Sequence, residues 1–125
     1  MIAVIDIGSN SVRLMLWADG KTILKRILTT RLGAGVKNGR LAKPSMERSA
    51  EAVSYLYSEA LKAGAEKVFA FATAAVRSAE NKGEFLELVK ETSGLTIDVV
   101  SGENEARLAA LGALGNGDGT RTRKR

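Results

Sequence analysis

The sequence predicts a single α/β domain in which helices pack on a mixed sheet, and three features support that prediction. Two short turns, at 8–11 and 19–20, join three successive strand-like runs, of which the first is largely apolar and the second alternates, as is typical of antiparallel hairpins. The run Lys67–Ala72 is almost wholly apolar, as in a strand buried on both faces of a parallel sheet. Elsewhere apolar residues recur at helical spacing. The expected order is β-β-β-α-β-α-β-α, with three antiparallel strands followed by βα units.

Length and composition exclude several kinds of chemistry. The chain has 125 residues, enough for one domain with a substantial core. It contains no cysteine, which excludes disulfides, thiolate metal sites and a cysteine nucleophile. It also contains no histidine, which excludes Ser-His-Asp triads and histidine metal ligands. Acid–base chemistry must therefore come from carboxylates, lysines or tyrosines.

The positive net charge of +5 is concentrated at the end of the chain. Four basic residues, Arg121, Arg123, Lys124 and Arg125, lie within the last five positions. Removing these four from the 19 basic side chains leaves 15 against 14 acidic ones. We interpret the run as a solvated tail and do not expect nucleic-acid binding. No apolar run approaches the roughly 20 residues of a membrane span, so we expect a cytoplasmic protein without a membrane segment.

The first part of the chain is expected to form three strands. The second, Val12–Ala18, places Val12, Leu14 and Leu16 on one face, and Asp19-Gly20 is a two-residue hairpin turn before the third strand at Thr22–Thr30. The glycine-rich stretch 31–40 follows. It is either a flexible connector or a loop that borders a cleft for an anionic ligand, and the sequence leaves both interpretations open.

Three helices are expected in the rest of the chain. The first begins at Pro44 and ends near Ala63, with Gly64 after it and an apolar stripe formed by Met46, Ala50, Val53, Tyr57, Ala60 and Leu61. The second, Lys82–Thr92, is expected to be capped by Asn81, to face inward through Phe85, Leu88 and Val89, and to stop at Gly94. A fifth strand over Leu95–Val100 should lead through Ser101 into a third helix at about 102–114.

Three sets of polar residues follow strands and are candidates for a site. Asp6 ends the first strand beside the turn Gly8-Ser9-Asn10-Ser11, whose N–H groups and hydroxyls can hold phosphate oxygens while the acid holds a cation. The alternative is an ordinary hairpin with a locally satisfied acid. Arg77 follows the fourth strand, where ligands gather in open α/β sheets, or else forms a surface ion pair. Glu105 falls in the first turn of the helix expected at about 102–114. Its carboxylate is expected either to point at a cleft above the sheet or to complement the dipole of that helix at the surface.

Three stretches together resemble the exopolyphosphatase / guanosine pentaphosphate phosphohydrolase (Ppx/GppA) family, which belongs to the actin–sugar kinase–Hsp70 superfamily. They are Asp6–Ser11 with its flanking strands, Phe71–Asn81 and Val99–Leu108. The resemblance implies a ribonuclease H-like lobe at residues 1–118, followed by a basic disordered tail at 119–125. It implies hydrolysis of the terminal phosphate of inorganic polyphosphate or guanosine pentaphosphate, with Mg²⁺.

The resemblance also implies a role for each candidate residue. Glu105 matches the glutamate that activates the attacking water, Asp6 the acid beside the metal, Gly8–Ser11 the phosphate cradle and Arg77 a phosphate contact. The family's second phosphate motif is not found after 119, so the second lobe is expected to be missing. We therefore expect this chain to have weak activity or none. The apolar surface that the second lobe would cover could drive self-association. The alternatives are a non-catalytic polyphosphate- or nucleotide-binding module and a lobe of a related sugar kinase or ATPase.

Overall fold

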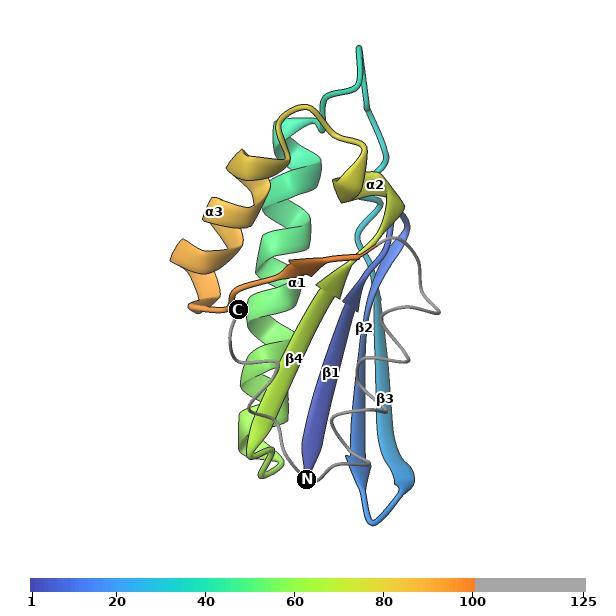
Figure 1. Ribbon diagram of the computed structural model, residues 1–125, viewed down its shortest axis with the longest axis vertical. Helices are drawn as coiled ribbons and strands as arrows, with labels where there is room; N and C mark the ends of the chain where they lie inside the picture. Colours follow the sequence, from blue (N-terminus) through green and yellow to red (C-terminus); the bar gives the residue numbers. More distant parts are fainter. Residues whose placement is uncertain (101–125) are drawn as a thin grey trace.

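The computed structural model describes residues 1–100, which form one five-stranded sheet with helices packed on it (Figure 1). The strands are β1 (Ile2–Ile7), β2 (Ser11–Ala18), β3 (Lys21–Thr29), β4 (Lys67–Ala72) and β5 (Asp98–Val99). The helices are α1 (Lys43–Lys62), α2 (Ala74–Arg77) and α3 (Lys82–Ser93). The predicted α/β class with a mixed sheet is confirmed.

The sheet has the strand order β3-β2-β1-β4-β5. The first three strands pair antiparallel through the two predicted turns, whereas β4 pairs parallel with β1 and β5 parallel with β4. Asp19 and Gly20 both have positive φ, 54° and 76°, as a two-residue turn between twisted strands requires. A register irregularity between Leu16 and Trp17 precedes this turn. The sheet therefore places β1 at its centre, with the carboxyl ends of β1 and β4 side by side.

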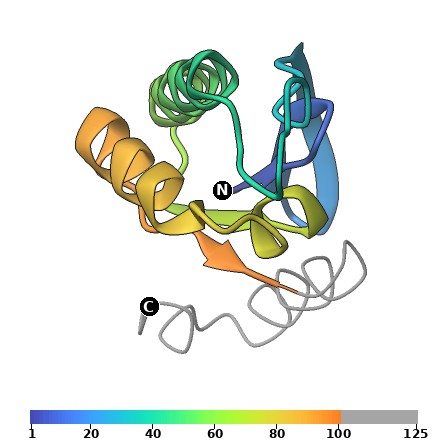
Figure 2. The ribbon, with the colours of Figure 1, turned by 90° about the horizontal axis from the view of Figure 1, so that it is seen from above.

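The main core lies between one face of the sheet and the helices. Ile5, Ile7, Val12, Leu14 and Leu16 are buried on this face. Figure 2 shows α1 and α3 side by side over it, and the two helices are in contact. Val4, Phe69 and Phe71 form a smaller cluster on the opposite face. Since β4 is buried on both faces, its apolar run reflects its position in the sheet.

The first long helix largely follows the prediction, with one correction. Pro44 lies in its first turn, and Gly64 follows its end with a φ of 101°. Leu61, which we expected on the buried stripe, is 50% exposed, whereas Leu56 is fully buried. The stripe is thus rotated relative to the prediction, because Leu56 and Ala60 complete the same face as Val53.

The segment after β4 differs from the prediction in three places. The short helix α2 was not predicted. Asn81 occupies the N-cap position of α3, but its side chain makes no capping bond and turns to another segment. The strand β5 covers two residues instead of six. Gly94 ends α3 in the left-handed region, as expected. Ser101 and the predicted helix at 102–114 lie outside the described residues, and no helix within residues 1–100 is long and apolar enough to cross a membrane.

Candidate functional site

The β1–β2 turn is closed by its own backbone. The Gly8 N–H donates to the Ser11 carbonyl at 2.9 Å, and a Cβ at position 8 would lie 3.3 Å from the same oxygen, tighter than most Cβ contacts. A glycine therefore suits this position because the chain approaches itself closely there. Asp6 precedes the turn and is half-buried, with its Oδ1 shielded from solvent.

The carbonyl groups of the turn are bonded to a distant segment. The Asn10 carbonyl accepts from the N–H groups of Thr30 at 3.0 Å and Arg31 at 2.9 Å, and the Ser9 carbonyl accepts from Gly33 at 2.8 Å. Within residues 1–100, the N–H groups of Ser9 and Asn10 donate to no protein group, and both residues are exposed. Because the carbonyls of Ser9 and Asn10 are occupied and their N–H groups are open, this part of the turn is suited to bind an anion.

Part of the glycine-rich stretch is therefore anchored at the turn. Leu32 is fully buried, which fixes the middle of the segment 30–34. From α1, Arg48 Nε donates to the Thr30 carbonyl at 2.9 Å, and Ser45 Oγ donates to the Ala34 carbonyl at 2.8 Å. Of the two interpretations of this stretch, the structure favours a loop that borders the turn over a free connector.

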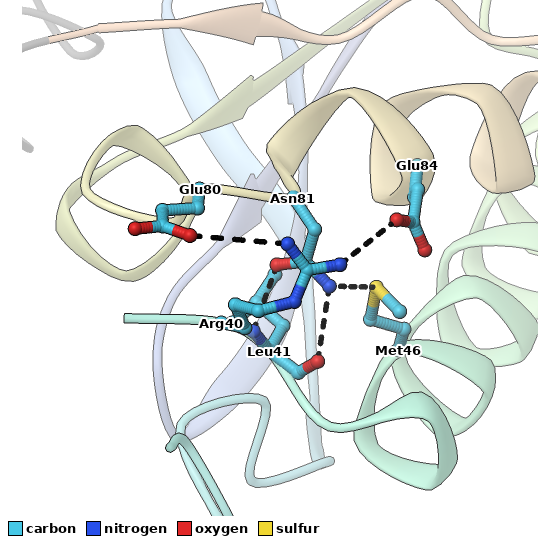
Figure 3. A network of polar contacts seen from close by, with 6 residues as sticks. All are labelled: Arg40, Leu41, Met46, Glu80, Asn81 and Glu84. Carbon is cyan, nitrogen blue, oxygen red and sulfur yellow. Dashed lines mark hydrogen bonds and ion pairs between the residues drawn. The ribbon is translucent and has the colours of Figure 1, made fainter. Parts of the chain in front are cut away.

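The other end of the stretch is tied to the start of α3 (Figure 3). The Asn81 amide accepts from the Leu41 N–H at 2.8 Å and donates to the Leu41 carbonyl at 3.1 Å. Arg40 forms ion pairs with Glu84 at 3.2 Å and Glu80 at 3.9 Å. A cavity of about 530 Å³ lies here between α1 and α3, and none of the predicted site residues lines it. Asn81 therefore joins the loop to the helix layer rather than to a ligand.

Arg77 lies at the same end of the sheet as the turn. The register pairs Asp6 with Phe71 and Ile7 with Ala72, so β1 and β4 end level with each other (Figure 1). The chain then forms α2, whose last residue is Arg77, and its Nη1 donates to the Val100 carbonyl at 3.2 Å. Of the predicted residues, Asp6, Gly8–Ser11 and Arg77 thus share one end of the sheet, and Glu105 lies outside the described residues.

Two arginines at this end were not singled out from the sequence. Arg13 is directly opposite Asp6 in the β1–β2 register. The signal was present, because Asp6 and Arg13 flank the turn symmetrically and share a face in any hairpin closed there. Arg31 is placed by hydrogen bonds between segments 20 residues apart, for which no local sequence signal exists.

The oxygen ligands available at this end of the sheet are compatible with magnesium. No group of three acidic side chains that could hold a metal occurs in residues 1–100. Mg²⁺ commonly takes only one or two protein carboxylates and completes its shell with water and phosphate oxygens. Asp6, half-buried beside a turn suited to phosphate, fits such an arrangement.

Comparisons with known proteins agree on one family. The model of the Ppx/GppA phosphatase family matches residues 4–123. A guanosine-5'-triphosphate,3'-diphosphate pyrophosphatase of Photobacterium profundum is 33% identical over 96% of this chain and 25% of its own length. Exopolyphosphatase 1 of Mycobacterium bovis is 28% identical over 88% of this chain and 34% of its own length.

Solved structures show the same likeness. The crystal structure of the Aquifex aeolicus Ppx/GppA family member superposes with a TM-score of 0.78 and 40% identity, over 90% of this chain and 38% of that one. An exopolyphosphatase of Cytophaga hutchinsonii gives a TM-score of 0.76 and 27% identity, over 86% and 36%. The chain thus spans between a quarter and two fifths of the length of these relatives. On the family match and the shared fold, this chain belongs to the Ppx/GppA phosphatase family.

Proposed function

We propose that this chain is the lobe of a phosphoanhydride hydrolase that releases the terminal phosphate of inorganic polyphosphate or guanosine pentaphosphate. In the proposed reaction a water oxygen attacks the terminal phosphorus, the bridging P–O bond breaks, and Glu105 takes the proton of the water. Such a reaction needs positioning and charge stabilisation rather than a covalent enzyme intermediate, so it is compatible with a chain without histidine or cysteine.

The observation that supports this proposal most strongly is the pattern of bonded and open backbone groups in the β1–β2 turn. The carbonyl oxygens of Ser9 and Asn10 accept hydrogen bonds from residues 30–33, while the N–H groups of the same two residues and the hydroxyls of Ser9 and Ser11 could contact an anion. Asp6 and Arg77 lie at the same end of the sheet. In this proposal Gly8–Ser11 holds a phosphate and Arg77 contacts it.

Magnesium is part of the proposal through Asp6. When bound, Mg²⁺ would neutralise charge on the phosphate oxygens. The Asp6 carboxylate would hold the ion or one of its waters. We expect added Mg²⁺ to strengthen tripolyphosphate binding, and Asp6→Asn to remove that gain while binding without Mg²⁺ persists. Calorimetric titrations with and without EDTA measure both. An equal gain in the variant would contradict a role of Asp6 in metal binding.

The isolated chain is proposed to be weakly active or inactive. It spans 25% to 38% of the length of the relatives named above. The names of these relatives refer to two phosphoanhydride substrates, guanosine-5'-triphosphate,3'-diphosphate and polyphosphate. The proposal includes both substrates, for a longer protein that contains such a lobe. Robust phosphate release by the 125-residue chain, abolished by Glu105→Gln, would contradict this expectation.

The experiment separates binding from hydrolysis. Tripolyphosphate affinity and phosphate release are measured for the unchanged chain, Arg77→Ala and Glu105→Gln. Loss of a charge-assisted hydrogen bond should lower the affinity of Arg77→Ala about tenfold, whereas Glu105→Gln should bind as the unchanged chain does. Unchanged affinity in Arg77→Ala would exclude the proposed phosphate contact.

A second candidate is a non-catalytic module that binds polyphosphate or nucleotide. It is favoured by the fact that the groups gathered in residues 1–100 are binding groups: open N–H donors, hydroxyls and arginines. Combining the chain with a separately expressed second lobe of a family member distinguishes the two. Hydrolysis that appears in the mixture and depends on Glu105 supports the enzyme lobe, and binding without hydrolysis supports the module.

A further inference from the structure

We infer that Arg31 is an anion-contacting residue of the phosphate turn, a second arginine beside Arg77. This inference rests on the proposed function, since it assigns a further ligand contact to the same site. Its basis is the place of Arg31 in the fold, its backbone conformation and the state of its charge.

The main chain of Arg31 is fixed against the turn. Its N–H donates to the Asn10 carbonyl at 2.9 Å, between the equivalent bonds of Thr30 and Gly33 to the turn. On its other side, Arg48 Nη2 approaches the Arg31 carbonyl at 3.4 Å and Ser45 Oγ at 3.1 Å. The backbone of Arg31 is therefore held on both sides, next to the turn in which the N–H groups of Ser9 and Asn10 are open.

The backbone conformation of Arg31 is unusual for its residue type. Within residues 1–100, three non-glycine residues have a positive φ: Asp19, Arg31 and Asn38, at 54°, 54° and 53°. Asp and Asn tolerate this region because their short polar side chains bond locally, whereas Arg gains no such relief. A glycine or asparagine would fit here with less strain. Residues held in such conformations cluster at functional sites, so the arginine is best explained by its side chain.

The charge of Arg31 is not used within the described part of the chain. Arg31 is exposed, and in residues 1–100 its guanidinium forms no hydrogen bond or ion pair. Arg48 is bonded to main-chain carbonyls, and Arg40 is paired with two glutamates. Among the described residues, nothing compensates the positive charge of Arg31 at the edge of a turn with open N–H groups, and such an arrangement suits phosphate recognition.

The test uses Arg31→Asn in the 125-residue chain, because asparagine removes the charge but tolerates the positive φ. Tripolyphosphate affinity is expected to fall about tenfold, while the unfolding temperature stays equal or rises. Arg31→Gly should behave in the same way, and Arg31→Lys should keep part of the affinity because it retains the charge without the planar fork. A fall in unfolding temperature together with affinity in both Arg31→Asn and Arg31→Gly would show a structural role and overturn the inference.

Two matched controls separate a contact from general electrostatics. Lys37→Asn removes one positive charge from the same loop at a position away from the turn, where Lys37 forms a backbone bridge with Arg40. Asn38→Gly relieves a positive φ without a change of charge. Both are expected to bind within about twofold of the unchanged chain. Equal losses in Lys37→Asn and Arg31→Asn would overturn the inference.

The results also separate a failure of the role of Arg31 from a failure of the proposed function as a whole. Binding that is unchanged in Arg31→Asn but lost in Arg77→Ala overturns the role of Arg31 and leaves the proposed function standing. Absence of tripolyphosphate binding by the unchanged chain, with and without Mg²⁺, overturns both.

Discussion

Two neighbouring residues on α1, the exposed Arg48 and the buried Ser49, show how differently polar side chains act in this fold. Arg48 donates to the carbonyl of Thr30 and approaches that of Arg31, and so fixes the segment that packs against the β1–β2 turn. Ser49 is fully buried, and within the described residues its hydroxyl has no hydrogen-bond partner. An unsatisfied buried hydroxyl destabilises the folded state, whereas a bonded one supports it.

Ser49→Ala is therefore expected to stabilise the chain. The change removes an unsatisfied hydroxyl and introduces the best helix former, which should raise the free energy of unfolding by about 1 kcal/mol. Urea denaturation followed by circular dichroism measures the difference. Ser45→Ala is the matched control on the same helix, because its hydroxyl donates to the Ala34 carbonyl. We expect it to lower stability by about 1 kcal/mol, and a loss of stability in Ser49→Ala would show that its hydroxyl is satisfied in solution.

At the scale of elements, the orientation of α1 depends on which leucine faces the sheet. Leu56 is fully buried and Leu61 is half exposed, although both fit an apolar pattern along the helix. Leu56→Ala should lower the free energy of unfolding by about 2–5 kcal/mol, because it leaves a cavity in the main core. Leu61→Ala should change it by less than about 1 kcal/mol. Chemical denaturation of both variants checks the helix face, and similar effects would contradict the observed rotation.

The amide of Asn81 joins two further elements. It satisfies both backbone groups of Leu41 and so links the start of α3 to the segment before α1 (Figure 3). Asn81→Ala leaves those groups without partners in a buried position. We expect a loss of stability of about 2–4 kcal/mol, measured by thermal and chemical unfolding.

Glu84→Gln is the control in the same network. It breaks the exposed pair with Arg40 and should change stability by less than about 1 kcal/mol. A small effect of Asn81→Ala would mean that water replaces the amide, which the burial of Asn81 argues against.

At the scale of the whole molecule, the net charge and the candidate site are separate features. Most of the +5 comes from Arg121, Arg123, Lys124 and Arg125, whereas the site gathers its arginines from β2, the segment after β3, and α2. A polyanion can bind nonspecifically to a basic run, so affinity alone does not locate the site.

Deletion of residues 120–125 tests this separation. At about 0.15 M salt, screening weakens nonspecific attraction, and tripolyphosphate affinity should stay within about twofold of the full chain. Isothermal titration at two salt concentrations measures it. If the affinity collapses on deletion while Arg77→Ala has no effect, the binding belongs to the basic run and not to the turn.

The sequence by itself determined the class of the fold, the position of the β1–β2 turn and the longer strands and helices of residues 1–100, but not α2 or the length of β5. Strand alternation, the Asp19-Gly20 pair, Pro44, Gly64 and Gly94 act locally, so their effects could be predicted to within a few residues. The three motifs, read from the residues alone, also indicated the family. The roles of Asp6, Gly8–Ser11, Arg77 and Glu105 stay predictions.

Only the tertiary structure decided what surrounds the turn. The bonds from Thr30, Arg31 and Gly33 to Ser9 and Asn10, and from Asn81 to Leu41, join residues 20 to 40 positions apart. Asn81 was predicted as a cap because its local pattern fits one, yet its amide instead satisfies two buried groups of another segment. Local propensity cannot encode such choices, since they depend on which backbone groups the packed chain leaves unsatisfied.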